Sequence, residues 1–215
     1  GSVSHGLKGL LTGLDGGMYM LDSGLKKEDT GQAREGLQMV KTMTERIRNM
    51  VLDLLFYAKK REISRQPVAV LDFARDVAGV VEEKLKWQDI EFVMDFEKAA
   101  GQFSVDASML RSALVNILEN AMDACVTDKE TSGKVTFSAA SEEDQVRFEI
   151  ADNGIGMDPE VQDRIFTLFF SSKGKQGTGL GLFIAGKVVA EHGGDIQVSS
   201  EPGKGSRFIV TIPKD

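Results

Sequence analysis

The segment Asn116-Ile117-Leu118-Glu119-Asn120-Ala121-Met122-Asp123-Ala124 decides the fold of this chain, because it sets two asparagines into an otherwise apolar helical pattern. Asn116 and Asn120 are four residues apart, so they share one face of a helix while apolar residues fill the opposite face. An amide oxygen is a neutral, hard ligand suited to Mg²⁺, which takes few protein ligands. Taken alone, two asparagines on a helix are more often surface residues than ligands, so the rest of the chain has to decide.

A second signature, Asp152-Asn153-Gly154-Ile155-Gly156-Met157-Asp158-Pro159, directly follows an alternating strand pattern. Its two glycines permit close backbone approach or positive φ, so a flat group could lie against the chain there. A fixed carboxylate beside such a site would accept a hydrogen bond from an exocyclic amino group such as that of adenine. The alternative for this stretch alone is an ordinary Asn-Gly turn.

The third signature is Gly177-Thr178-Gly179-Leu180-Gly181-Leu182, directly before an apolar helical pattern. Glycine-rich backbone that leads into a helix N-terminus offers N–H groups and the positive end of the helix dipole to a phosphate. Between the second and third signatures, phenylalanines at 166, 169 and 170 precede the basic, glycine-containing stretch 171–175. Such a segment fits a lid over a polyphosphate, or a surface loop without a ligand.

The order of these signatures resembles the catalytic ATP-binding domain of sensor histidine kinases, within the wider family that includes gyrase-type ATPases. The resemblance covers roughly residues 67–213 and consists of an N box (116–124), a G1 box (152–156), an F box (166–170) and a G2 box (177–181). It implies an α+β protein whose second part is an α/β sandwich of the Bergerat (GHKL ATPase) type. ATP would lie between the sheet and the lid.

The resemblance also assigns roles to single residues. Asp152 would hold the adenine amino group, Asn120 would bind Mg²⁺ and Asn116 would face the phosphates. The other expected nucleotide contacts are Asp123, Gly154, Gly156, Phe169, Lys173, Gly177, Thr178, Gly179, Leu180 and Gly181. ATP and Mg²⁺ are therefore the expected cofactors.

The first part of the chain, up to about Arg65, has a different pattern, in which apolar residues recur at helical spacing. Those from Leu37 to Ala58 step by three and four, a 3.5-residue period that marks helices burying a narrow seam against other helices. The polar stretch 26–31 suits a chain reversal, which predicts a helical hairpin with helices over about 3–26 and 31–63. Two helices make a poor core, so we expect a homodimer in which two hairpins form a four-helix bundle.

The first of these helices carries glycines at 6, 9, 13, 16 and 17. Each interior glycine costs a helix about 1 kcal/mol relative to alanine. Positions 6, 9, 13 and 16 follow one face, which predicts a stripe that lets another backbone or a bulky partner approach closely. The alternative is that this segment is not a full helix.

Ser4-His5 stands at the head of the first helix, about 110 residues before the N box. Neutral imidazole is abundant near pH 7, which suits histidine to accept a phosphoryl group. With the hairpin, this resembles the dimerisation and histidine-phosphotransfer domain of sensor kinases, with an H box that begins at His5. The resemblance implies that His5 attacks the γ-phosphate of ATP and that the phosphoryl group then passes to an aspartate of a separate response regulator.

The H box departs from the family pattern at two positions and also lacks the usual proline. Gly6 stands where an acidic residue usually accepts the proton, and Gly9 stands where Thr or Asn is linked to phosphatase activity. General-base help is typically worth about 10²–10⁴-fold, so we expect slow autophosphorylation. Phosphatase activity is expected to be weak or to run by another route. Two alternatives stay open: an ATPase or serine/threonine-directed kinase of the same family, and a nucleotide-binding dimeric scaffold without catalysis.

Composition narrows the class of protein further. The net charge of −7 argues against general nucleic-acid binding, and a single cysteine excludes a disulfide scaffold. No apolar run reaches the roughly 20 residues of a membrane span and no signal-peptide pattern occurs. A cytoplasmic location is therefore expected, with any membrane attachment through segments outside this sequence. We predict two domains, a phosphotransfer hairpin over 1–65 and a catalytic ATP-binding domain over 66–215.

From Pro67 onward, strands and helices are expected in mixed order. Strands are predicted over about 67–71, 90–96, 134–140, 145–152, 195–200 and 206–213, and helices over 72–86, 106–126 and 179–192. Asp72 and Asp106 are the expected N-caps of two of these helices. Hairpin-linked strands mixed with helices predict a layered sandwich and not a doubly wound parallel sheet.

Overall fold

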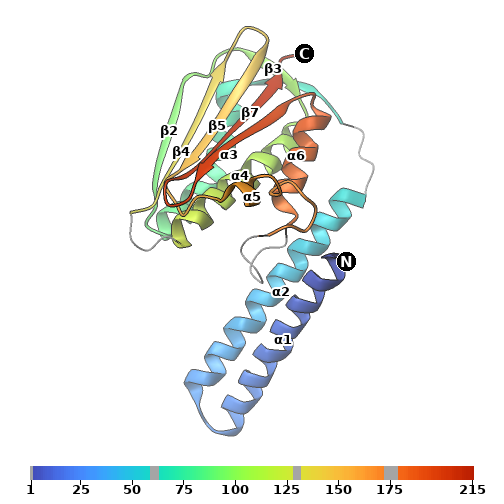
Figure 1. The fold of residues 1–215 in the computed structure, drawn as a ribbon, viewed down its shortest axis with the longest axis vertical. Coiled ribbons are helices and arrows are strands. Elements are labelled where there is room, and N and C mark those ends of the chain that lie inside the picture. Colours follow the sequence, from blue (N-terminus) through green and yellow to red (C-terminus); the bar gives the residue numbers. More distant parts are fainter. Residues whose placement is uncertain (1, 59–62, 128–131, 172–178) are drawn as a thin grey trace. The chain divides into compact units, whose positions relative to one another are not determined.

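The computed structural model in Figure 1 describes four ranges of the chain, residues 2–58, 63–127, 132–171 and 179–215, with the backbone alone for 2–6, 49, 52–58 and 127. The chain divides into two compact units, Gly1–Lys60 with Thr167–Leu180, and Arg61–Phe166 with Gly181–Asp215. None of the helices in the described ranges combines the length and the apolar character that crossing a membrane requires.

The first unit contains the predicted hairpin, formed by α1 (Ser2–Lys26) and α2 (Thr30–Ala58). Asp29 Oδ1 accepts the backbone N–H of Gln32 at 2.9 Å and so caps the start of α2. Glu28, in the reversal itself, takes a left-handed conformation with φ +57°. The prediction of two helices joined by a short polar reversal is confirmed.

Glycines bring the backbones of α1 and α2 together. A Cβ at Gly24 would lie less than 3.0 Å from backbone atoms of Ala33, and a Cβ at Gly36 would lie equally close to the backbone of Leu21. Neither position has room for a side chain. The hairpin seam is therefore tight enough for direct contact between helix backbones.

The glycine stripe of α1 differs from the prediction, although the helix itself is continuous. Leu10, Gly17 and Gly24 are buried at seven-residue spacing, whereas nothing lies within 4 Å of a Cβ built at Gly9 or Gly16. Gly13 of the predicted stripe does face α2, because a Cβ there would lie 2.8 Å from Sδ of Met43. Glycines 9 and 16 lie beside the seam and not in it, so the stripe is only partly confirmed.

The second unit is built on a five-stranded sheet of order β2-β4-β5-β7-β6 (Figure 1). Its strands are β2 (Glu91–Lys98), β4 (Lys134–Ser141), β5 (Gln145–Asp152), β6 (Asp195–Glu201) and β7 (Gly205–Pro213). Strands β2 and β4 are parallel and the other neighbours are antiparallel. The sheet is thus mixed, as predicted for a sandwich and unlike a doubly wound fold.

Helices cover one face of this sheet (Figure 1). They are α3 (Val70–Trp87), α4 (Ala107–Thr127) and α6 (Gly181–Glu191), with the short α5 (Pro159–Gln162) beside β6. Between helices and sheet, Phe73 packs edge-on against Phe103 and Phe148, with ring centroids 5.5 and 5.7 Å apart. On the opposite face of the sheet, Glu149 pairs with Arg147 at 2.7 Å and with Arg207 at 2.9 Å. One face is therefore apolar and covered, and the other is polar.

Three local predictions need correction. The first strand is β1 (Gln66–Ala69), shorter than predicted, and it pairs with β3 (Gln102–Val105), a strand that the sequence pattern did not predict. Helix α3 begins at Val70, so its N-cap is Ala69 and Asp72 lies in the first turn without capping it. Burial of Val70 explains the earlier start, because it extends the apolar face of α3 by one residue. Asp106, by contrast, accepts the N–H of Met109 at 3.1 Å and is a true N-cap.

Candidate functional site

The carboxylate of Asp152 lies at the end of β5, with β4 on one side and β7 on the other. The residue is only 9% exposed, and its Oδ1 accepts the N–H of Gly154 at 2.9 Å. A carboxylate held by the turn that follows it has a fixed orientation, which is what recognition of a single donor group requires. The predicted acceptor is therefore preorganised.

The glycines after Asp152 make room for other parts of the protein. A Cβ at Gly154 would lie less than 3.0 Å from the backbone of Ala124 in α4. Gly156 has φ +63°, and a Cβ there would lie as close to the carbonyl of Glu201. These glycines therefore admit backbone of the protein itself, from helix α4 and the end of β6, whereas the flat ligand expected beside them stays a prediction.

The turn between β6 and β7 packs directly behind the G1 box. Gly203 N–H donates to the carbonyl of Ile155 at 2.8 Å. Gly205 has φ +92°, and a Cβ there would overlap the carbonyl of Asp152. The sequence pattern placed 202–205 only between the predicted strands 195–200 and 206–213. The available signal was the pair of glycines at 203 and 205, whose closeness to Asp152 comes from the β5–β7 pairing and is not visible in the local sequence.

Gln162 is a second residue that the sequence did not reveal. Its Nε2 donates to the carbonyl of Met157 at 3.1 Å and to that of Ser200 at 3.0 Å. The side chain thus ties the segment after the G1 box to strand β6. A lone glutamine in a four-residue helix carries no local signature of this role.

Helix α4 presents its polar residues along one face. Asn116 and Asn120 are half-buried and Asp123 is exposed, one turn further along, while Leu114 and Ile117 on the opposite face are fully buried. Asn120 Nδ2 donates to the carbonyl of Asn116 at 2.7 Å, one turn back in the helix. The predicted division of the N box into an amide face and a core face is thereby confirmed.

The N box also contacts the start of α6. Asn116 Nδ2 donates to the carbonyl of Gly181 at 3.3 Å, and a Cβ at Gly181 would sit 3.5 Å from the Asn116 side chain. Gly181 is the first residue of α6, two residues later than the predicted helix start. Residues from the N and G2 boxes, 65 positions apart in sequence, are therefore neighbours.

In the first unit, the F box contacts Gly179, the first residue of the G2 box that the structure describes. Phe169 N–H donates to the carbonyl of Gly179 at 2.9 Å, and both residues are left-handed, with φ +64° and +65°. A Cβ at Gly179 would lie less than 3.0 Å from the backbone of Phe169, so glycine is required there. Leu180, which follows it, is fully buried.

Some predicted site residues have no described contacts. Lys173, Gly177 and Thr178 lie outside the described residues, and His5 is described only as backbone in the first turns of α1. Within the described ranges, no group of three or more His, Cys, Asp or Glu side chains could hold a metal ion.

Sequence comparison identifies a family for the second unit. The profile of a family described as histidine kinase-, DNA gyrase B-, and HSP90-like ATPase matches residues 105–215. Among curated proteins, signal transduction histidine-protein kinase AtoS of Escherichia coli is 29% identical over 181 residues, which cover 84% of this chain and 29% of AtoS. The chain spans less than a third of the length of AtoS and of two further curated sensor kinases that it matches.

Solved structures of histidine kinases are also similar to this chain. The histidine kinase ThkA in complex with response regulator protein TrrA has a TM-score of 0.80 and 25% identity, covering 99% of this chain and 60% of that chain. Full-length ShkA in complex with AMPPNP has a TM-score of 0.71 and 28% identity, covering 94% of this chain and 43% of that chain. Both similarities extend over the hairpin as well as the sheet.

Proposed function

This chain belongs to the histidine kinase-, DNA gyrase B-, and HSP90-like ATPase family, and from that premise we propose that it is the core of a sensor histidine kinase. It would bind Mg-ATP, phosphorylate itself on a histidine and pass the phosphoryl group to an aspartate of a response regulator. The observation that carries the proposal is the fixed carboxylate of Asp152 beside the glycine turn at the end of β5.

Recognition of adenine would fall to Asp152. Its carboxylate can accept from the exocyclic amino group, and its low exposure excludes most competing water. The bond that it accepts from Gly154 holds the carboxylate without occupying all of its acceptor positions, since each oxygen has two lone pairs. Removal of a buried partner of this kind costs about 1–3 kcal/mol of binding.

The phosphates and Mg²⁺ would lie along the amide face of α4. Because Asn120 Nδ2 donates to the helix, its oxygen is the atom suited to ligate the cation. Asn116, joined to the first residue of α6, would face the phosphates together with Asp123 and the backbone of 179–181. Bound Mg²⁺ would neutralise charge on the phosphate oxygens. Lys173, Gly177 and Thr178 would complete the contacts.

His5 is the proposed phosphoryl acceptor. An imidazole nitrogen attacks the γ-phosphorus, the bond to the β–γ bridging oxygen breaks, and ADP leaves. An aspartate carboxylate of the regulator then attacks the same phosphorus and releases the imidazole. Gly6 supplies no carboxylate for the imidazole proton, so water has to take it, and we expect a slow first step.

The hairpin would dimerise through apolar residues that it leaves exposed. On α1, Leu11, Met18 and Leu25 are seven residues apart and 46%, 56% and 66% exposed. On α2, Leu37 and Val51 are 41% and 46% exposed, two heptads apart. Heptad spacing on both helices supports a four-helix bundle of two copies. The domain boundary that we propose, at 65/66, lies a few residues after Lys60, where the first stretch of the first compact unit ends.

The response regulator is the proposed partner, supported by the similarity to ThkA, which was solved in complex with TrrA. Its receiver domain would approach the phosphorylated hairpin. ATP and such regulators are available in the cytoplasm, which is the proposed location.

Labelling from γ-labelled ATP tests the proposal. The unaltered chain should acquire acid-labile, base-stable label, and His5→Gln should acquire none while still binding Mg-ATP. Acid-stable label would instead indicate a serine/threonine-directed kinase. Tight binding of ATP without label would indicate a scaffold, the outcome that the glycine at position 6 favours.

A further inference from the structure

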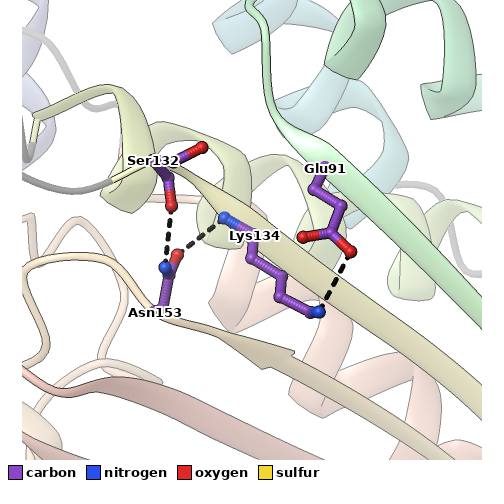
Figure 2. Close-up of polar contacts among 4 residues, drawn as sticks. All are labelled: Glu91, Ser132, Lys134 and Asn153. Carbon is purple, nitrogen blue, oxygen red and sulfur yellow. Dashed lines mark hydrogen bonds and ion pairs between the residues drawn. The ribbon is translucent and has the colours of Figure 1, made fainter.

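Asn153, the residue between the adenine acceptor and the first glycine, makes more side-chain bonds than an ordinary turn requires (Figure 2). Its Oδ1 accepts the backbone N–H of Lys134 at 2.6 Å, and its Nδ2 donates to the carbonyl of Ser132 at 2.9 Å. Its own backbone N–H donates to the carbonyl of Lys134 at 3.2 Å. These bonds, called the Asn153 clasp below, fasten the end of β5 to the start of β4.

The clasp extends to the C-terminal turns of α4. Cys125 Sγ lies 3.6 Å from Asn153 Oδ1 and 3.7 Å from the carbonyl of Lys134. The next two residues continue the connection, because Ile155 N–H donates to the carbonyl of Ala124 at 3.4 Å and Gly154 leaves room for the same helix backbone. Asn153 therefore lies where β4, β5 and α4 meet.

The junction of β4, β5 and α4 sets the distance between Asp152 and Asn120, which belong to the two halves of the proposed nucleotide site. Asp152 precedes Asn153 directly, and Asn120 lies one helical turn before Ala124. A shift of β5 relative to α4 would move the adenine acceptor against the amide that faces the cation. ATP would contact Asp152 and Asn120 at the same time, so its binding requires that the distance between these two side chains stays fixed.

We propose that Asn153 is a positioning residue for the nucleotide site, acting through the junction of β5, β4 and α4 and not through contact with the nucleotide. The proposal rests on the function proposed above and adds to it a residue without a nucleotide contact. An Asn-Gly turn alone would need only a residue that tolerates the turn, whereas the clasp needs an acceptor and a donor on one planar group.

The test compares Mg-ATP affinity, by calorimetry, in the unaltered chain and in variants at Asn153. Asn153→Ala removes both side-chain bonds and should weaken binding by roughly 5- to 30-fold. Asn153→Asp keeps the acceptor for Lys134 N–H and loses the donor to Ser132. Its affinity for Mg-ATP should therefore lie between that of the unaltered chain and that of Asn153→Ala. Intermediate affinity is the signature of the bonds themselves.

Two control variants separate positioning from loss of stability. Glu91→Gln removes the 3.0 Å ion pair with Lys134 that is also drawn in Figure 2, without touching Asn153, and should leave affinity unchanged. Val146→Ala destabilises the other end of β5, where Val146 is fully buried. It should lower the melting temperature at least as much as Asn153→Ala without a comparable loss of affinity.

Cys125 supplies an independent readout, because it is the chain's one cysteine and is buried against the clasp. Its labelling by a thiol reagent should accelerate in Asn153→Ala but not in Glu91→Gln. Mg-ATP should slow labelling of the unaltered chain, and it should slow labelling of Asn153→Ala by a smaller factor.

The outcomes distinguish the two proposals. If the unaltered, folded chain does not bind Mg-ATP, the proposed function is overturned and the positioning role with it. If it binds, but Asn153→Ala loses no more affinity than Val146→Ala or keeps the full protection of Cys125 by nucleotide, the positioning role alone is overturned.

Discussion

The hairpin and the sheet unit both use glycine to bring backbones into contact, but they differ in how complete they are. In the hairpin, Gly24 and Gly36 are helical and admit the facing helix, and apolar residues such as Met18 remain exposed. In the sheet unit, Gly156 and Gly205 have positive φ as well as crowded surroundings, and the central phenylalanines are fully buried. The sheet unit thus buries an apolar core of its own, whereas the hairpin is proposed to complete its core with a second copy. The following substitutions test that difference.

Gly205→Ala should have the largest effect. The new Cβ meets a left-handed φ and the carbonyl of Asp152, so we expect a loss of roughly 3–5 kcal/mol of unfolding free energy and of nucleotide binding. Gly203→Ala is the matched control, because its φ is +74° but nothing lies within 4 Å of the Cβ. It should cost only about 1 kcal/mol, measured by urea denaturation. Equal losses of unfolding free energy in the two variants would show that the left-handed φ, and not the contact with Asp152, explains the effect of Gly205→Ala.

Met18→Glu should be next, and it acts on the hairpin alone. Replacement of an apolar side chain by a charge in both copies should weaken dimerisation by about 3 kcal/mol. Analytical ultracentrifugation over a dilution series would measure this. Thr12→Glu, an exposed position on another side of α1, should leave the dimer intact. A chain that is monomeric before any substitution would contradict the view that the hairpin is incomplete.

Gly36→Ala tests the tight seam of the hairpin. The Cβ would collide with the backbone of Leu21, and separation of the helices should cost about 1–3 kcal/mol. Gly16→Ala, where nothing lies within 4 Å, should instead stabilise α1 by about 1 kcal/mol. Thermal melts at one fixed protein concentration would compare the two. If both substitutions change the melting temperature in the same direction, the seam runs through a different face of α1.

Asp106→Ala should have the smallest effect, in the sheet unit. It removes the N-cap of α4 and should cost about 1 kcal/mol of unfolding free energy in urea denaturation. Asp72→Ala is the control, since Asp72 makes no cap bond and contributes only through the helix dipole, worth about 0.5 kcal/mol. A larger loss at Asp72 would contradict the cap assignment.

Periodicity predicted the parts of the fold that local patterns encode. The alternation of β5 and the amide face of α4 are visible in the sequence and confirmed by burial, whereas Leu37 and Val51 of the predicted α2 seam are exposed. Strand β3 was missed because Gln102–Val105 is short and defined by its pairing with β1. The glycine stripe of α1 was only partly right, because Gly13 faces α2 whereas Gly9 and Gly16 do not.

The site was predictable where one motif contains both partners. Asp152 and the N–H that holds it are two residues apart, and Asn116 and Asn120 one turn apart. Gly205, Gln162 and Asn153 escaped because their partners come from other strands, and only register brings them together. The backbone contacts that hold a site in place are long-range, so local sequence does not reveal them.

The hydrogen bond from Phe169 N–H to the Gly179 carbonyl has a consequence for protein engineering. It fixes the two end points of the intervening peptide, so a graft of different length would start and finish at the same coordinates. Each doubling of such a graft should add only about 0.6 kcal/mol of closure entropy. Chimaeras exchanged between these two residues would therefore test, through the dissociation rate of the nucleotide, whether this stretch acts as the lid that the sequence suggests.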